Sequence, residues 1–268
     1  MDALFTPGQF YDLSGTYPAV GPVANCSNLG CSTPLSPGQN GSGNAYHFYD
    51  KMAETAPVRM AGQLERGSFS FWMRPQWEAS RRAFGNPLYT TLFQLGTDAS
   101  PIMSLYYRAA NDAEGNGTLK RAYLEFRITP TYLNGTGGDP ITVPVRHWLI
   151  GGRWYHIAVA WDVDGQSSNG TSKVSIYIDG RLKVQYALIA PGAVPANASL
   201  TLPAESVIRF GSDRGNAEHL GYGTTLDDVR LYSGVCYTGD VLTQAESTIC
   251  PTPLFYENFD GPPQFRVP

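Results

Sequence analysis

The chain has 268 residues and a formal net charge of −4, and its hydrophobic content of 42% is enough for a large core. Charged residues make up only 16%, against roughly 25% in typical globular domains, and no basic run occurs, which argues against a nucleic-acid partner. No stretch of about 18 apolar residues is present, so we expect no insertion into a membrane.

Apolar and polar residues alternate with a period of two along most of the chain, which predicts β-strands with one buried face. In chain order the expected strands are 44–50, 68–75, 89–96, 102–108, 121–129, 141–150, 154–162, 172–180, 182–188, 206–211 and 226–232. The side chains expected to face the core are Phe69, Phe71, Met73, Ala122, Leu124, Phe126, Ile128, Tyr155, Ile157, Val159, Trp161, Val174, Ile176 and Ile178.

Turn signals separate these strands, and Asp179-Gly180 in "YIDGRL" is typical of a two-residue hairpin. The only helix candidate lies within "TGDVLTQAES", residues 238–247. About a dozen short strands of this kind pack as two antiparallel sheets. We therefore expect one all-β sandwich domain over residues 1–268, with its core in 43–245.

A Pro-, Gly- and Ser-rich loop over 21–43 contains Cys26 and Cys31, and the other two cysteines, Cys236 and Cys250, flank another turn-rich segment. Two local disulfides, Cys26–Cys31 and Cys236–Cys250, would suit an oxidising compartment. Four buried thiols are the alternative reading. No histidine lies near either pair, so a zinc site is not expected.

Six Asn-x-Ser/Thr sequons are present, and four of them read Asn-Gly-Ser/Thr. Asn-Gly favours tight turns because both residues tolerate positive φ. Turn formation is therefore one explanation of the sequons, and N-glycosylation of a secreted protein is the more specific alternative. The candidate sites are Asn25, Asn40, Asn116, Asn134, Asn169 and Asn197.

Six segments occur in an order that resembles the laminin G-like domains of the concanavalin A-like superfamily, in their pentraxin-related form. They are "GNAYHFYD" (43–50), "SFSFWMRP" (68–75), "GRWYHIAVAWDVDG" (152–165), "KVSIYIDGRL" (173–182), "IRFGSD" (208–213) and "LDDVRLYSG" (226–234). The resemblance implies a jelly-roll sandwich that binds glycans or proteins at extracellular surfaces, often with calcium at the rim.

Asp227 and Asp228 form the one acidic pair in an apolar, aromatic run. Neighbours in a strand point to opposite faces, so we expect Asp227 to face the core with Val229 and Leu231. Asp228 would then pair with Arg230 on the other face. Two diverging carboxylates cannot flank a glycosidic bond, so the pair is expected to be structural. Asp227 could be satisfied by backbone N–H groups or by a calcium ion.

Other catalytic signals are weak. The Glu-x-Asp-x-x-Glu string of the related glucanases is absent, and so is the Gln-x-His element of the related alginate lyases. His47, His147, His156 and His219 show no metal spacing. We expect no catalytic residues. A polysaccharide lyase or hydrolase ranks third among the expected functions, after a recognition module and a structural subunit.

A stripe of polar and aromatic residues is the best candidate for a binding surface, because aromatic rings cover sugar C–H faces while charged groups bind hydroxyls. Its predicted members are Tyr123, Glu125, Arg127, Arg146 and Trp148, with Trp77 and Tyr222 as further candidates. An ordinary solvated sheet face is the alternative.

The C-terminal segment "LFYENFD", residues 254–260, has strand character. It could complete its own sandwich, or it could add to the sheet edge of another copy.

The expected function is recognition of a glycan or a neighbouring protein at an extracellular, cell or virion surface, as in adhesion. The alternative is a structural subunit of a filament or virion, assembled from copies of the chain. The N-terminus carries no signal peptide pattern. An extracellular protein of this sequence would therefore either have lost its signal peptide already or leave its cell by another route, such as lysis.

Overall fold

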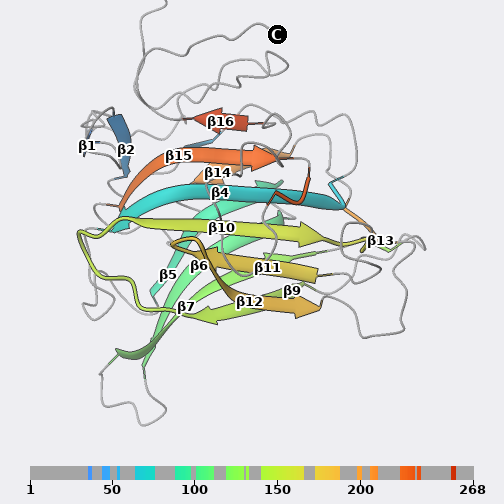
Figure 1. Ribbon diagram of the computed structural model, residues 1–268, viewed down its shortest axis with the longest axis horizontal. Coiled ribbons are helices and arrows are strands. Elements are labelled where there is room, and N and C mark those ends of the chain that lie inside the picture. The colour runs from blue at the N-terminus through green and yellow to red at the C-terminus, as the bar shows by residue number, and fades with distance from the viewer. Residues whose placement is uncertain are drawn as a thin grey trace, which may run out of the picture.

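The computed structural model describes residues 36–37, 44–48, 53–54, 64–75, 88–97, 101–111, 119–129, 131–132, 140–165, 173–187, 198–200, 206–210, 224–232, 234–236 and 255–257. All regular structure in these ranges is β-strand (Figure 1). The strands are β1 Ser36–Pro37, β2 Asn44–Phe48, β3 Ala53–Glu54, β4 Arg66–Pro75, β5 Leu88–Gly96, β6 Pro101–Asn111, β7 Leu119–Ile128, β8 Thr131–Tyr132, β9 Ile141–Arg146, β10 Tyr155–Asp162, β11 Lys173–Ile178, β12 Arg181–Ala187, β13 Ala198–Ser199, β14 Val207–Phe210, β15 Thr224–Tyr232 and β16 Phe255–Glu257.

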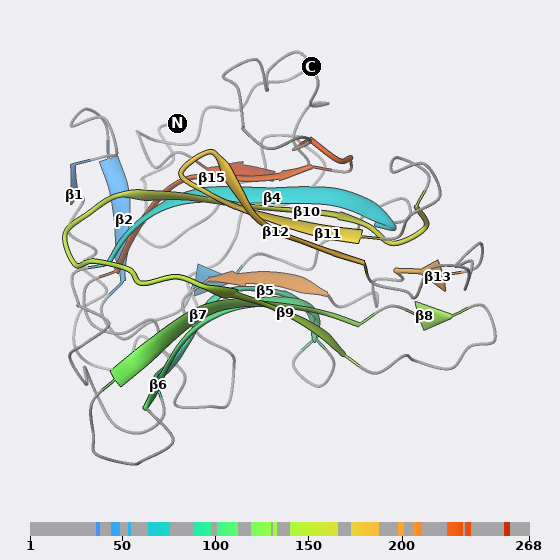
Figure 2. The ribbon, with the colours of Figure 1, turned by 60° about the horizontal axis from the view of Figure 1, so that its bottom comes forward.

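Two antiparallel sheets face each other across one core, as the turned view in Figure 2 shows. The first, here the β4 sheet, has the order β1-β2-β15-β4-β10-β11-β12, with β16 added beside β15. The second, the β6 sheet, has the order β3-β14-β5-β6-β7-β9. Strands distant in sequence are neighbours in both sheets, and the predicted two-sheet jelly-roll sandwich is therefore confirmed.

The core between the sheets is built from the side chains that the alternation pattern predicts. Each of the fourteen expected core residues belongs to one buried cluster. Phe69 of the β4 sheet stacks on Phe93 of the β6 sheet with ring centroids 3.8 Å apart. Trp161 is fully buried and donates its indole N–H to the carbonyl of Leu64 at 2.8 Å. The indole therefore has an apolar environment without an unpaired donor, which is how tryptophan is accommodated in a core.

The hairpin between β11 and β12 turns at the predicted dipeptide. Asp179 has φ 51° and Gly180 has φ 73°. Two consecutive residues with positive φ are what a two-residue turn of primed type requires, because its twist matches that of the strands. The Asp179 carboxylate also accepts the N–H of His156 at 3.0 Å and contacts Arg153 at 2.8 Å, which ties the turn to the start of β10.

A second, smaller apolar cluster lies outside the β4 sheet. It contains Ala158, Ala160, Tyr177, Tyr232 and Cys236. Ser68 fixes the segment 234–236 on this face, because its hydroxyl donates to the carbonyl of Gly234 at 2.8 Å and accepts the N–H of Cys236 at 2.7 Å. The small residues on β4 and β10 leave room for the chain to cross the sheet here.

The far edge of β15 is shared by two short strands. Residues 224–226 pair with β2, and residues 229–231 pair with β16. The C-terminal segment thus pairs with a strand of its own chain, as one of the two expected alternatives proposes. Since β16 covers backbone groups that β2 leaves open, the C-terminal segment completes this sheet edge.

Some boundaries differ from the prediction. The strand expected over 141–150 ends at Arg146, because the chain then leaves the β6 sheet for β10. In this segment, tyrosine hydroxyls accept the backbone hydrogen bonds that a neighbouring strand would otherwise accept. The N–H of Leu149 donates to the Tyr107 hydroxyl at 3.2 Å, and the N–H of Ile150 donates to the Tyr155 hydroxyl at 2.8 Å. The expected loop over 21–43 contains the short strand β1.

Several predictions fall outside the described residues. They concern the helix candidate, the six sequons, Trp77, Tyr222, Cys26, Cys31 and Cys250. Cys236 is buried, and both disulfides stay predictions. Within the described ranges, no helix is long and apolar enough to cross a membrane.

Gly67 is required by the position of Trp161. A Cβ atom at residue 67 would lie 2.1 Å from the Trp161 ring, whose position is fixed by its hydrogen bond to Leu64. We expect Gly67→Ala to lower the free energy of unfolding by about 3 kcal/mol, measured by urea denaturation. Gly152→Ala is the control, because Gly152 has open space around it and a φ of +80°. Its cost should be about 1 kcal/mol from backbone strain, and equal losses would contradict this account.

Truncation tests the role of β16. A chain ending at Cys250 lacks the strand that pairs with residues 229–231, so its melting temperature should fall while the parent chain remains a monomer in size-exclusion chromatography. An oligomeric parent that becomes a monomer with unchanged melting temperature would instead indicate strand exchange between copies.

Candidate functional site

The outer face of the β6 sheet carries the predicted stripe. Tyr123, Glu125 and Arg127 alternate on β7 with the core residues Leu124 and Phe126. Strand pairing places Arg146 directly opposite Tyr123. Residues directly opposite each other in an antiparallel pair share a face, so the four polar residues lie together as predicted. The strands of this sheet are curved, and the outer face is the concave one (Figure 2).

Glu125 is the centre of a charge network on this face. It is only 4% exposed, yet its side chain points away from the core. Arg108 binds Oε1 through Nε at 2.7 Å and through Nη2 at 2.6 Å, while Arg127 Nη2 lies 3.6 Å from Oε2. A buried carboxylate without partners would be strongly unfavourable, so the two guanidinium groups explain how Glu125 is tolerated.

Each of these two arginines also places its guanidinium group over a tyrosine ring. The guanidinium carbon of Arg127 lies 4.7 Å from the centroid of the Tyr106 ring, and that of Arg108 lies 5.2 Å from the Tyr123 ring. Both distances are within the range of cation–π attraction. The guanidinium groups are therefore held by the carboxylate and by the aromatic rings, which gives this surface a defined arrangement of N–H donors.

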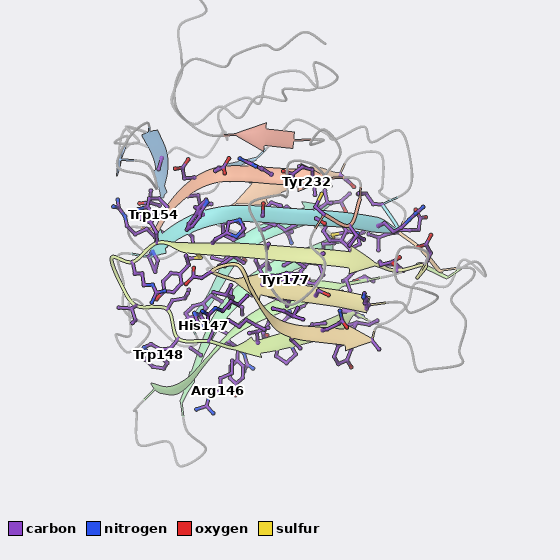
Figure 3. All side chains as sticks on the ribbon, viewed as in Figure 1. Arg146, His147, Trp148, Trp154, Tyr177 and Tyr232 are labelled. Carbon is purple, nitrogen blue, oxygen red and sulfur yellow. The ribbon has the colours of Figure 1, made fainter. Side chains whose placement is uncertain are left out.

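Arg146 lies opposite Tyr123 of this face, and Figure 3 shows Arg146 and Trp148 toward the lower margin of the strands. Arg146 is exposed, and Trp148 is 37% exposed. His147, between them in sequence, packs edge-on against Tyr155, so it does not join them. Trp148 stands beyond the end of β9.

Tyr106 and Arg108 belong to the network but were not predicted from the sequence. Arg108 binds Glu125, and Tyr106 lies against Arg127. Both lie in a segment expected to be a strand, and their alternation with Leu105 and Tyr107 could have suggested an outer face. Their partners were not predictable, because the register of β6 against β7, which sets Arg108 opposite Tyr123, is a tertiary property.

The acidic pair departs from its predicted geometry. Asp227 lies opposite Trp72, an outer residue of β4, rather than facing the core. A β-bulge follows, since two residues lie between Asp227 and Arg230 but only one lies between their partners Trp72 and Ser70. Asp228 occupies the bulge with φ 49°. The extra residue resets the alternation, and the expected orientation of Asp227 with Val229 and Leu231 is therefore wrong.

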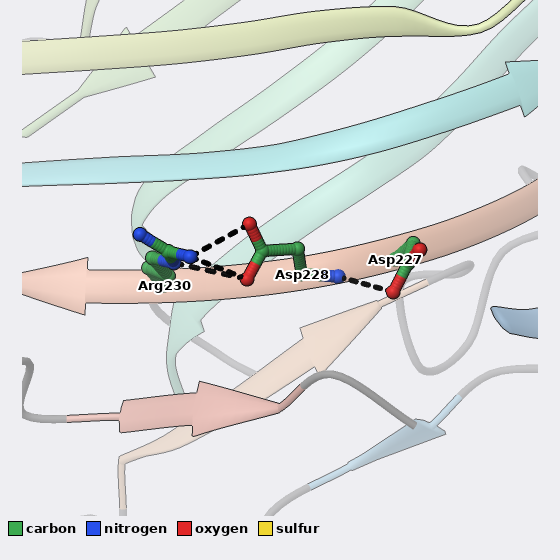
Figure 4. Close-up of polar contacts among 3 residues, drawn as sticks. All are labelled: Asp227, Asp228 and Arg230. Atoms are coloured by element: carbon green, nitrogen blue, oxygen red, sulfur yellow. Dashed lines mark hydrogen bonds and ion pairs between the residues drawn. The ribbon is translucent and has the colours of Figure 1, made fainter. Parts of the chain in front are cut away.

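Each carboxylate of the pair has a local partner. Asp228 binds Nη2 of Arg230 with both oxygens, at 2.8 and 2.9 Å, which confirms the expected ion pair. Asp227 Oδ1 accepts the N–H of Asp228 at 2.8 Å. Figure 4 shows the Asp228 carboxylate turned toward Arg230 and away from Asp227. These contacts give both residues a part in forming the bulge.

A calcium ion at Asp227 stays a prediction. The described ranges contain no group of three or more His, Cys, Asp or Glu residues that could hold a metal ion. Calcium prefers six to eight oxygen ligands, so such a site would need ligands besides Asp227.

His156 lies on the same outer face of the β4 sheet, opposite Trp72, with ring centroids 5.0 Å apart. Burial lowers its pKa to about 4, and nearby Asp228 only partly offsets this shift. The imidazole is consequently neutral in the folded protein near pH 7. Trp72 of β4 thus lies between His156 on β10 and Asp227 on β15.

Comparison with known proteins finds no matching family model and no matching curated protein. Solved structures with a similar arrangement include a putative carbohydrate-binding protein from Bacteroides ovatus, with 16% identity and a TM-score of 0.48 over 82% of this chain and 52% of that one. Mouse laminin alpha1 domains LG4-5 match with 10% identity and a TM-score of 0.44, over 80% of this chain and 48% of that one. An endo-β-1,4-glucuronan lyase from Trichoderma reesei matches with 15% identity and a TM-score of 0.44, over 78% of both chains.

The chain thus spans about half of the length of the first two proteins. The likeness concerns the fold alone, and the two-sheet arrangement itself rests on the strand pairing described above.

The low pKa of His156 predicts a pH dependence of stability. Unfolded histidine binds a proton below about pH 6.5, whereas folded His156 does so only near pH 4. Acidification from pH 6.5 to 4 therefore favours the unfolded state, by about 3 kcal/mol at most from this group. Denaturant unfolding should show a shallower loss over this range for His156→Phe than for the parent. Equal losses in both proteins would contradict the assignment.

Proposed function

We propose that the outer face of the β6 sheet binds carbohydrate and that the protein is a non-catalytic recognition module at an extracellular or particle surface. The observation that carries the proposal is the Glu125-centred network beside two exposed residues, Arg146 and Trp148. Sugar sites combine an aromatic surface with a few convergent polar groups held in place. The outer face of the β6 sheet has both components.

The roles of the predicted residues can be refined from their contacts. Both oxygens of Glu125 are engaged by arginines and the residue is buried, so we assign it the positioning of Arg108 and Arg127. The ring of Tyr123 has a guanidinium beside it, which leaves Trp148 as the more accessible aromatic surface for a sugar. Arg127 and Arg146 would supply N–H donors to hydroxyl or acidic groups.

The absence of a second carboxylate supports the non-catalytic part of the proposal. Hydrolysis of a glycosidic bond uses two carboxyl groups about 5 to 9.5 Å apart. At the described outward positions of β6, β7 and β9, Glu125 is the single carboxylate, and it is bound by two arginines. His147, next to Arg146 in sequence, packs against Tyr155 instead.

Pairing of β16 within its own chain favours recognition over assembly by strand exchange. A structural subunit joined by sheet faces is the competing function. It predicts self-association without any glycan ligand, and the binding experiment below separates the two.

Replacement of Trp148 provides the test. Trp148→Ala should weaken glycan binding about tenfold, equivalent to about 1.4 kcal/mol of lost contact, with little change in melting temperature because the side chain is partly exposed. Binding is measured on a glycan array and then by calorimetry with the best ligand, with and without EDTA.

Tyr186→Ala is the matched control, since Tyr186 is an exposed aromatic residue (44%) on the opposite sheet. Absence of any glycan hit, or an equal loss in the control, would remove the support for this face. Unsaturated products detected by ultraviolet absorbance would overturn the non-catalytic assignment.

A further inference from the structure

On β6, β7 and β9, the charge of the described outward residues is opposite in sign to that of the whole chain. The described outward residues of β6, β7 and β9 include three arginines, Arg108, Arg127 and Arg146, and one carboxylate, Glu125. Three positive charges against one negative charge leave an excess of +2, although the chain carries −4. A local excess of positive charge attracts ligands of negative charge.

The three arginines are not equivalent. Arg108 and Arg127 contact Glu125. Arg146 is exposed and makes no ion pair with the described residues, although it lies directly opposite Tyr123. A guanidinium presents a planar fork of donors that binds a carboxylate or sulfate through two parallel hydrogen bonds. Arg146 is therefore the guanidinium best placed to pair with an anionic group of a ligand.

A neutral sugar would leave this charge uncompensated. Covering the face with a ligand removes water from the cations, and a desolvated charge is costly unless it gains an opposite partner. An acidic sugar supplies that partner, whereas the hydroxyls of a neutral sugar supply only dipoles. The charge balance therefore selects acidic ligands over neutral ligands of the same shape.

The spacing of the arginines favours a polymer over a single anion. Arg108, Tyr123 and Arg146 lie on three adjacent strands in one row, so the outer two are roughly 10 Å apart at strand spacings of about 4.8 Å. The guanidinium groups of Arg108 and Arg127 both contact Glu125, so this face presents two positive centres, that pair and Arg146. Two separated positive centres match acidic groups that repeat along a chain.

We propose, on the basis of the proposed function, that the ligand is an acidic polysaccharide, with a carboxylate or sulfate bound by Arg146 next to Trp148. Glu125 acts as a positioning residue in this arrangement. It keeps Arg108 and Arg127 in register on the face while lowering their combined charge, so that ligand acidic groups meet donors already in place.

Matched polymer pairs test the charge requirement. The probes are polygalacturonate and its methyl ester, polyglucuronate and its carboxyl-reduced form, and chondroitin sulfate and its desulfated, carboxyl-reduced form. The full-length protein should bind at least one acidic polymer at least tenfold more tightly than its neutral partner in calorimetry, and the difference should shrink between 50 and 500 mM salt. Equal affinity for the two members of every bound pair would overturn the inference and leave carbohydrate binding intact. No binding to any polymer, neutral or acidic, would overturn the proposed function itself.

Variants of Arg146 locate the anionic group. Arg146→Gln should weaken binding of the acidic polymer at least tenfold more than it weakens binding of the neutral partner, while Arg146→Lys, which keeps the charge, should lose less. Arg181→Gln is the control, because Arg181 is an exposed arginine on β12 of the other sheet. If Arg181→Gln weakens binding as much as Arg146→Gln, the attraction is general and the assignment of Arg146 is wrong.

Discussion

The apolar layer shared by the two sheets is the constraint on which the rest of the structure depends. Phe69, Phe93 and Trp161 fill it from both sides, and burial of such side chains is the dominant favourable contribution to folding. Because successive residues of a strand point to opposite faces, fixing the inner residues also fixes which side chains face outward. The polar stripe on β7 is a direct consequence of packing its alternate residues in the core.

The two outer faces are put to different uses. Over the β4 sheet, small residues on β4 and β10 allow the segment 234–236 to cross, and Ser68 bonds it in place. Over the β6 sheet, large polar residues form an arginine–glutamate–tyrosine network instead. A buried ion pair is a weak source of stability, because desolvation offsets most of its attraction. A network of this kind is better explained by the defined positions that it gives to charged groups than by a gain in stability.

The bulge on β15 illustrates how one inserted residue changes a chemical interpretation. Regular alternation would send Asp227 inward, where a carboxylate needs strong compensation. The extra residue at Asp228 turns Asp227 outward and places it opposite Trp72. It also coincides with the point where the neighbour of β15 changes from β2 to β16. The acidic pair is thus tied to the architecture of a sheet edge.

The sequence by itself determined the fold class, the core residues and the turn at Asp179-Gly180, because alternation and turn chemistry are local properties that act within a few residues. It also placed Tyr123, Glu125 and Arg127 on one face for the same reason. The bulge at Asp228, the role of Arg108 and Tyr106, and the burial of Glu125 were decided by the tertiary structure. Each depends on the register between strands distant in sequence, and that register is set when the two sheets pack, since no short segment encodes which neighbour it will meet.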